Sequence, residues 1–381
     1  DPSSARLIMW ESGGSQPHAS VEVRGLSTSF GATFPAEEEP FIFPAPGGKK
    51  EAPLYIHRAY IEGLSPGEGY NYRLLAEGNA SPWERLDTPK SDYVAGLIFC
   101  DSQCGNSYDA WQTVLTRACV EYPEADFLTV IGDLVDNGQS LWHFREWSNV
   151  AAHVLPQKIF VPVMGNHECY SLDWKMCLPK GYLTSFSPPT NGNADFDGYY
   201  YSFKLGAAKF FVLNTQMEEL EGFKPGLFEQ QLAWLREEAK EETTWRIVLM
   251  HKDILTYEHD GEISPAGRAF MPLFDEISID LVLTGHMHAY RDRGHIKDFR
   301  PADIGPYYVM AGLAGNCYYD VPLDKTFDKR RGNERKQNYI FVEITDEKLS
   351  LSTPGYQVYS AEVKKPVDSK VILQKEAPFA K

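Results

Sequence analysis

The sequence predicts an α/β protein with a small β-domain in front of the α/β part, and two observations lead to this fold class. In residues 1–91, short alternating runs are separated by Gly- and Pro-rich turns, without a helical pattern. In residues 92–381, short apolar strands alternate with helical stretches, which is typical of an α/β sheet. A length of 381 residues suits one large domain and a smaller one.

The first region, residues 1–91, is predicted to form an antiparallel β-sandwich. Strands are expected at Ser20–Arg24, Leu54–Ile61 and Tyr70–Leu75, where polar and apolar residues alternate and β-branched or aromatic residues are frequent. Turns are expected at residues 44–48 and 65–69, which are rich in Gly and Pro. Short strands with such turns between them are typical of a sandwich.

The second region, residues 92–381, alternates strands and helices. Its expected strands are Tyr93–Cys100, Asp126–Ile131, Ile159–Met164, Lys209–Asn214, Trp245–Met250, Asp280–Thr284, Tyr307–Ala311, Tyr339–Ile344 and Lys348–Ser352. Its expected helices are Tyr108–Cys119, Leu141–Val154, Pro225–Glu242 and Gly267–Ile277. The aromatic-, Pro- and Gly-rich segment Cys169–Tyr199 is expected to border the active site, and the chain ends in a lysine-bearing tail.

The charge balance limits the partners of the protein. With 37 Lys and Arg against 53 Asp and Glu, the formal net charge is −16. Proteins that hold long nucleic acids need clustered basic residues, so we expect no such partner. A small anionic substrate is not excluded, because it responds to the local field of its site. No run approaches the roughly 20 consecutive apolar residues of a membrane-spanning helix, so no membrane span is expected.

The cysteines bear on the compartment in which the protein works. They are Cys100, Cys104, Cys119, Cys169, Cys177 and Cys317. Their even number, and the short loop that Cys169 and Cys177 would close, favour structural disulfides; reduced core thiols are the alternative. No CxxC pair occurs, which argues against a zinc knuckle. We expect a secreted, periplasmic or cell-surface protein whose leader has been removed.

Five loops that directly follow predicted strands carry side chains of the kinds that bind metal ions. They are Asp101-Ser102-Gln103, Gly132-Asp133-Leu134-Val135-Asp136-Asn137, Gly165-Asn166-His167-Glu168, Val248-Leu249-Met250-His251 and Gly285-His286-Met287-His288. In an open α/β sheet, side chains at the C-terminal ends of neighbouring strands converge on one crevice. Carboxylates, an amide oxygen and imidazoles suit Zn²⁺, Mn²⁺ or Fe ions. Seven donors exceed one tetrahedral site, so two ions sharing a bridging carboxylate are expected.

Each loop taken alone has an ordinary explanation. Gly132-Asp133 resembles a turn with a capping Asp, the Gly165 loop could begin a helix, and a lone His251 is more often a satisfied core residue. The pair His286 and His288 is more specific, because burying both imidazoles without partners is costly. All five loops in order at strand ends favour a dinuclear metal site.

In this order the loops resemble the pattern of the calcineurin-like metallophosphoesterases, and within them the purple acid phosphatase branch. The spacing Val248–His251 and the run Gly285–Arg291 point to that branch. Ile61–Arg73 is similar to a fibronectin-type-III-like strand of its N-terminal domain. The resemblance implies a fibronectin-type-III-like domain at residues 1–91. It also implies an α/β/β/α four-layer sandwich at residues 92–381, with the active site at the strand C-termini.

The resemblance also implies a role for each residue of the loops. The first ion would be held by Asp101, Gln103, Asp133 and His288. The second would be held by Asn166, His251, His286 and Asp133, which bridges the two ions. Catalysis would involve Asp133 and His167. Asp136 and Glu168 would orient the ligands, and substrate contacts would come from Asn166, His167 and Arg291. Lys252 and Arg293, just beyond two of the loops, could also contact an anion, although solvated basic side chains are the ordinary explanation.

Two positions depart from the family pattern. Asp136 stands where purple acid phosphatases place a metal-binding tyrosinate, so no phenolate-to-iron colour is expected and a permanently ferric ion is in doubt. Gln103 stands where most metallophosphoesterases have His. Its amide oxygen is a neutral, hard donor, which favours Mn²⁺ or Fe²⁺, and an orienting role without ligation is the alternative.

These features predict a metal-dependent phosphohydrolase acting on a small phosphomonoester or phosphodiester. Two cations, of Fe, Mn or Zn, would lower the pKa of a bound water and supply a hydroxide that attacks phosphorus. His167 would assist the leaving group. A nucleotide pyrophosphatase or phosphodiesterase is the first alternative, and a secreted binding protein with a vestigial metal site is the second.

Overall fold

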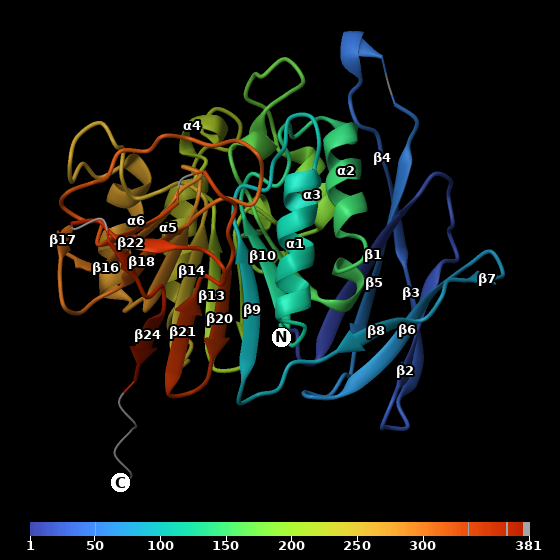
Figure 1. The fold of residues 1–381 in the computed structure, drawn as a ribbon. Helices are drawn as coiled ribbons and strands as arrows, with labels where there is room; N and C mark the ends of the chain where they lie inside the picture. Colours follow the sequence, from blue (N-terminus) through green and yellow to red (C-terminus); the bar gives the residue numbers. More distant parts are fainter. Residues whose placement is uncertain (50, 334, 363–364, 376–381) are drawn as a thin grey trace.

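The structure is a computed structural model that describes residues 1–49, 51–333, 335–362 and 365–375. Its N-terminal part consists of two antiparallel sheets (blue in Figure 1). The first has the order β1–β5–β4: β1 (Ala5–Ser12), β5 (Leu54–Glu62) and β4 (Glu37–Phe41). The second has the order β3–β2–β6–β7, with β8 also paired to β6: β3 (Gly31–Pro35), β2 (Ser20–Gly25), β6 (Gly69–Ala76), β7 (Asn79–Ala80) and β8 (Glu84–Asp87). Val21 and Val23 of one sheet share a core with Ala59 and Ile61 of the other, so the predicted β-sandwich is present.

Two larger sheets form the rest of the chain. One has the order β11–β10–β9–β20–β21–β24: β11 (Ile159–Val163), β10 (Phe127–Ile131), β9 (Val94–Phe99), β20 (Ile340–Ile344), β21 (Lys348–Ser352) and β24 (Val371–Gln374). The other has the order β12–β13–β14–β15–β18–β16–β19–β22–β23, with β17 paired to β16: β12 (Tyr201–Leu205), β13 (Ala208–Leu213), β14 (Trp245–Met250), β15 (Leu281–Thr284), β18 (Tyr307–Ala311), β16 (Tyr290–Lys297), β19 (Arg330–Gly332), β22 (Val358–Ser360), β23 (Pro366–Val367) and β17 (Arg300–Pro301).

Burial shows that these two sheets pack face to face with helices outside them. Every residue of β9, β10 and β13 is buried, as expected for strands covered on both faces. Ile98 of β9 packs between the sheets with Val212 and Leu249. Its neighbour Phe99 faces the other way, edge-on to Trp111 of α1 with ring centroids 5.0 Å apart. The predicted four-layer α/β/β/α arrangement is therefore confirmed (Figure 1).

The helices lie in the two outer layers, and their ends differ slightly from the predicted ones. They are α1 (Asp109–Glu121), α2 (Leu141–Ala151), α3 (Lys180–Phe186), α4 (Met217–Leu220), α5 (Leu227–Glu238) and α6 (Pro265–Glu276). The four predicted helices are α1, α2, α5 and α6. The structure begins α6 before the predicted Gly267, because the Ser264 hydroxyl accepts a hydrogen bond from the Gly267 N–H at 3.0 Å. The short helices α3 and α4 were not predicted.

The front sandwich packs directly against the α/β part. Phe43, in the loop after β4, contacts Phe144 of α2 with ring centroids 5.3 Å apart. The Tyr72 hydroxyl of β6 donates to the carbonyl oxygen of Pro156 at 2.9 Å. The two parts share core residues, and the division at residues 91 and 92 stays a prediction.

Within the described ranges, no helix has the length and apolar character to cross a bilayer. The end of the predicted lysine-bearing tail, residues 376–381, lies outside these ranges.

Candidate metal centre

The five predicted loops meet at one place, at the C-terminal ends of strands from both larger sheets. The first three follow β9, β10 and β11, and the last two follow β14 and β15. Two groups have donor atoms within 4.8 Å of one another: Asp133, His251 and His286 form one, and Asp101, Asp133 and His288 form the other. Asp133 belongs to both groups, which is the position of a carboxylate that bridges two ions.

Four of these residues adopt a backbone conformation that side chains normally avoid. The φ angles are 49° at Asp101, 48° at Asp133, 74° at His286 and 52° at His288. A left-handed conformation costs a non-glycine residue about 1–2 kcal/mol. Such strain is concentrated at functional sites, where the surrounding structure imposes it. Its presence at four predicted ligands supports a site built for function.

Glycines allow the loops to approach each other closely. A Cβ atom at Gly165 would overlap the side chain and backbone of Asp133. A Cβ at Gly132, which has a φ of 76°, would overlap the ring of His251. These two glycines are therefore required by contact between ligand loops.

Two histidines are oriented by backbone carbonyl groups. His251 Nδ1 lies 2.9 Å from the Ile131 oxygen, and His288 Nδ1 lies 2.6 Å from the Cys317 oxygen. A carbonyl oxygen can only accept a hydrogen bond, so each Nδ1 carries a proton. Each Nε2 is then left with an electron pair that can bind a cation. His251 Nε2 lies 3.3 Å from Asp133 Oδ2, and His288 Nε2 lies 3.5 Å from Asp101 Oδ1.

The two amide side chains lie in the same centre. Asn166 Oδ1 is 3.0 Å from His251 Nε2, beside the second predicted group. The Gln103 amide lies 3.1 Å from His288 Nε2. Swapping the two ends of the Gln103 amide places its oxygen 3.1 Å from His288 Nε2 and lets its nitrogen donate to the Asp133 carbonyl oxygen at 2.9 Å. In that orientation Gln103 offers an oxygen to the first group.

Glu168 fixes the two loops that carry Asp133 and Asn166. Its Oε1 accepts hydrogen bonds from the N–H groups of Leu134 and Val135, at 2.9 and 3.2 Å. Its Oε2 accepts from the N–H groups of Asp133 and Gly165, at 3.1 and 2.7 Å. This fully buried carboxylate therefore ties both loops together through four backbone donors.

His167 faces the centre without belonging to either donor group. Its Nδ1 donates to the Asp136 carbonyl oxygen at 2.7 Å, and its Nε2 lies 3.8 Å from Asp133 Oδ2. Asp136 thus orients His167 chiefly through its backbone, while its carboxylate lies 3.6 Å from the same Nδ1. In the described chain, the Asp136 carboxylate joins neither donor group.

The electrostatics of the centre favour positive charge. Burial raises the pKa of Asp101. Burial alone would raise the pKa of Asp133 as well, but His251 and His167 hold it below its usual range. Burial alone would lower the pKa of His251, yet the carboxylates of Asp133 and Asp101 raise it to about 9. Burial and then the neighbouring His251 lower the pKa of His286 to about 3. Two buried carboxylates among imidazole and amide donors fit bound cations.

Comparison with known proteins identifies the family. The model of the calcineurin-like phosphoesterase family matches residues 96–290, just over half of the chain. The chain belongs to this family.

Two curated relatives and one solved structure show what the chain is similar to. Phosphoenolpyruvate phosphatase of Allium cepa is 25% identical over 295 residues, 69% of this chain and 58% of that protein. Purple acid phosphatase 23 of Arabidopsis thaliana is 24% identical over 351 residues, 83% of this chain and 72% of that protein. The purple acid phosphatase PPD1 from yellow lupin (Lupinus luteus) seeds has a TM-score of 0.78 at 17% identity, covering 98% of this chain and 72% of that one. The chain thus spans less than two thirds of the onion relative.

Two arginines expected near substrate are instead part of a buried ionic network. Arg291 is fully buried, with Nε 3.4 Å from Asp328 and Nη2 donating to the Val321 carbonyl oxygen at 2.8 Å. Arg293 donates to both oxygens of Asp253 at 2.6 and 2.7 Å. The side chain of Arg291 is closed off from solvent in this network, which corrects the expectation that it contacts substrate.

The remaining members of this network connect the loops that carry His251 and His286. Asp253, two residues after His251, accepts from the Thr284 hydroxyl at 2.8 Å, and Thr284 ends β15. Arg293 Nε reaches Asp328 at 3.1 Å. Outside this network, Lys252 pairs with Glu219 at 2.9 Å. The network therefore supports the candidate metal centre structurally.

The expected disulfides are absent, because all six cysteines are free. The chain brings Cys169 and Cys177 near each other, since the Cys177 N–H donates to the Cys169 carbonyl oxygen at 2.8 Å. Spacing in the sequence indicated this proximity, but the thiols are not bonded. Burial raises the pKa of the Cys169 thiol, which makes it a core residue with little thiolate character.

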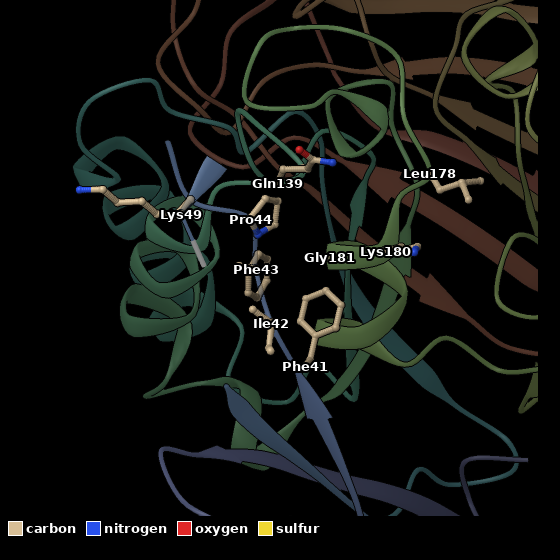
Figure 2. Close-up of a pocket in the computed structure, with 11 residues that line it drawn as sticks. Phe41, Ile42, Phe43, Pro44, Lys49, Gln139, Leu178, Lys180 and Gly181 are labelled. Carbon is tan, nitrogen blue, oxygen red and sulfur yellow. The ribbon is translucent and has the colours of Figure 1, made fainter. Parts of the chain in front are cut away.

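A cavity of about 490 Å³ lies between the front sandwich and the α/β part (Figure 2). Its lining residues are Phe41, Ile42, Phe43, Pro44, Ala45, Lys49, Gly138, Gln139, Leu178, Lys180 and Gly181. None of them is a predicted metal ligand. The Gly138 N–H donates to the His167 carbonyl oxygen at 2.9 Å, so the cavity adjoins the back of the His167 loop. The segment Cys169–Tyr199 borders this cavity through three of its residues.

A supporting segment that was not predicted from the sequence follows β13. Gln216 Nε2 donates to the Met164 carbonyl oxygen at 3.0 Å, and the Thr215 hydroxyl accepts from the Lys252 N–H at 2.9 Å. Asn214–Gln216 is buried and thereby joins the loops that carry Asn166 and His251. Its signal in the sequence is the same as for the ligand loops, a polar run directly after an apolar strand.

Proposed function

We propose that this chain is a metal-dependent hydrolase of small phosphoesters with two metal ions. The observation that carries the proposal is the position of Asp133 in both donor groups. One ion would be held by Asp101, Gln103, Asp133 and His288, and the other by Asp133, Asn166, His251 and His286. When bound, two ions of the Fe, Mn or Zn kind offset the charge of the phosphoryl oxygens and activate water as the nucleophile.

His167 is the residue that we propose to assist the leaving group. In hydrolysis a water oxygen bonds to phosphorus, the ester P–O bond breaks, and the departing oxygen takes up a proton. The Asp136 carbonyl oxygen accepts from His167 Nδ1, so Nε2 is directed toward the centre. The imidazole is partly exposed and reaches an incoming substrate. Asn166, beside it on the same loop, is the second proposed substrate contact.

The residue at position 136 indicates which metal ions the proposed centre would hold. No tyrosine occupies the position of the family's tyrosinate, so we propose a centre without phenolate-to-iron charge transfer, with divalent ions preferred. The oxygen of Gln103 near His288 supports the same preference. Elemental analysis of the purified protein, with a visible absorption spectrum, tests this. A strong visible band in the iron-loaded protein would contradict it.

The Asp133→Asn variant tests the function itself. A neutral amide at the shared position should lower metal content and reduce hydrolysis at least a hundredfold, because both ions lose a charged ligand. Metal content and rates on a nitrophenyl phosphomonoester, a bis-nitrophenyl diester and a dinucleotide are measured for wild type and variant. Asp303→Asn, an exposed carboxylate, is the matched control. Wild-type protein without metal and without activity toward all three substrates, even with added Mn²⁺, Zn²⁺ or Fe²⁺, would favour the binding-protein alternative.

A secreted, periplasmic or cell-surface location stays a prediction. The six free thiols remove the support that disulfides would have given it. Fractionation of the producing cells checks the location directly.

A further inference from the structure

Trp174 is an exposed ring placed against the proposed proton donor. Its side chain is 55% exposed, although large aromatic residues usually bury much of their surface. Its ring lies edge-on to His167, with centroids 5.9 Å apart. Tyr170 contacts both rings, at 5.9 Å from His167 and 6.2 Å from Trp174. The three rings form one cluster, of which Trp174 is the member most open to solvent.

The backbone of Trp174 adopts an energetically unfavourable conformation. Its φ angle is 58°, a left-handed conformation that is unfavourable for a bulky residue. The turn is fixed by the Trp174 N–H, which donates to the Ser171 carbonyl oxygen at 2.8 Å, and by Asn137 Nδ2, which donates to the same oxygen at 2.7 Å. Asn137 belongs to the Asp133 loop, so the turn is anchored to the metal centre. A strained and exposed aromatic residue on such an anchor indicates a binding role.

The position of His167 indicates which part of a substrate would contact Trp174. If His167 delivers a proton to the departing oxygen, the alcohol part of the ester lies on the His167 side of the centre. Trp174 contacts His167 on that side. Its exposed surface suits a flat, apolar ring that stacks face to face, whereas a small sugar or a short alkyl alcohol has no ring to match it.

We propose that Trp174, supported by Tyr170, is a stacking subsite for a planar aromatic or heteroaromatic ring in the alcohol part of the phosphoester, as in a nucleotide. The subsite rests on the proposed phosphoesterase function. It determines substrate preference and takes no part in bond making.

Adenosine 5′-monophosphate and ribose 5-phosphate form a matched pair of substrates, because in both the phosphoryl group leaves the primary 5-hydroxyl of a ribose, and only the nucleotide carries a base. We expect wild type to have about tenfold higher kcat/KM for the nucleotide, within the range of base–aromatic stacking. Trp174→Ala should abolish this preference while kcat/KM for ribose 5-phosphate changes less than about twofold. Trp174→Phe should restore most of the preference. Trp83→Ala, an exposed tryptophan on the front sandwich that packs against Arg24 and Arg73, is the control and should leave the preference intact.

A second readout does not depend on turnover. Calorimetric titration of the metal-loaded protein with a non-hydrolysable phosphonate analogue of adenosine 5′-monophosphate should give about tenfold weaker binding for Trp174→Ala than for wild type. Equal losses on both substrates would overturn the subsite and assign Trp174 a structural role at His167. A wild type without preference in rate and in binding would overturn it too. If no substrate is hydrolysed but the binding difference persists, the subsite stands and the proposed hydrolysis fails.

Discussion

The two sides of the metal centre are held in place by different forces. On the side of β10 and β11, four backbone N–H groups converge on the single carboxylate of Glu168, and we call this the amide-held side. On the side of β14 and β15, Asp253, Thr284, Arg293 and Asp328 form a buried ionic network, and we call this the ion-held side. The difference matters for stability. Removing one partner of a buried ion pair costs more free energy of unfolding than removing one partner of a hydrogen bond with a neutral donor.

Breaking the ion-held side should have the largest effect on stability. Arg293→Met leaves the Asp253 carboxylate buried without its cation, which typically costs about 3–5 kcal/mol. We expect a lower midpoint in urea unfolding and loss of the metal ion on the His251 side. Arg300→Met, at an exposed arginine in β17, should change stability by less than about 0.5 kcal/mol. Equal midpoints for Arg293→Met and wild type would show that the network adds no stability.

Breaking the amide-held side should have an intermediate effect. Glu168→Gln keeps the size of the side chain but replaces one oxygen with an NH₂ group, which faces N–H donors and cannot accept from them. The expected loss is about 2 kcal/mol in the free energy of unfolding and about 10- to 100-fold in metal affinity. Urea unfolding and metal titration measure both, with the exposed Glu229→Gln as control. Unchanged metal affinity in Glu168→Gln would mean that the four donors do not position Asp133.

The smallest effect on stability is expected for His167, which lies on the amide-held side and whose ring makes one hydrogen bond to the Asp133 loop, at the Asp136 carbonyl oxygen. His167→Ala should leave metal content and the unfolding midpoint near wild type, while kcat falls about 10²- to 10⁴-fold with the loss of the proton donor. The exposed His259→Ala provides the control. Metal loss together with a normal rate per bound metal would instead assign His167 a ligand role.

The candidate metal ligands at strand ends could be predicted from the sequence. The side chains that hold their loops in place could not. Asp101, Asp133 and His251 each directly follow an apolar strand, so their convergence follows from the sheet. The partner of Arg293 could not be predicted, because Asp253 is 40 residues away and nothing local marks the pair. Arg291 was misassigned for the same reason: its position beside a ligand loop does not reveal that the side chain points into the core.

Backbone strain is the other property that the sequence does not carry. Asp and His are residues that tolerate a positive φ, but they occur in many other conformations. The left-handed conformations at Asp101 and His286 arise from the packing of several loops at once. Likewise, the even number of cysteines could not decide between disulfides and free thiols, because bonding depends on distances between side chains that spacing alone leaves open.

The contact between Phe43 and Phe144 links the front sandwich to the chemistry of the rest of the molecule. Phe144 lies in the first turns of α2, which begins four residues after Asn137, the end of the Asp133 loop. A substitution in the front sandwich can thus shift the start of α2 without touching any metal ligand. Substrate preference can therefore evolve indirectly. Substitutions in the front sheets can reposition the Asp133 loop while the metal-ligand residues stay the same.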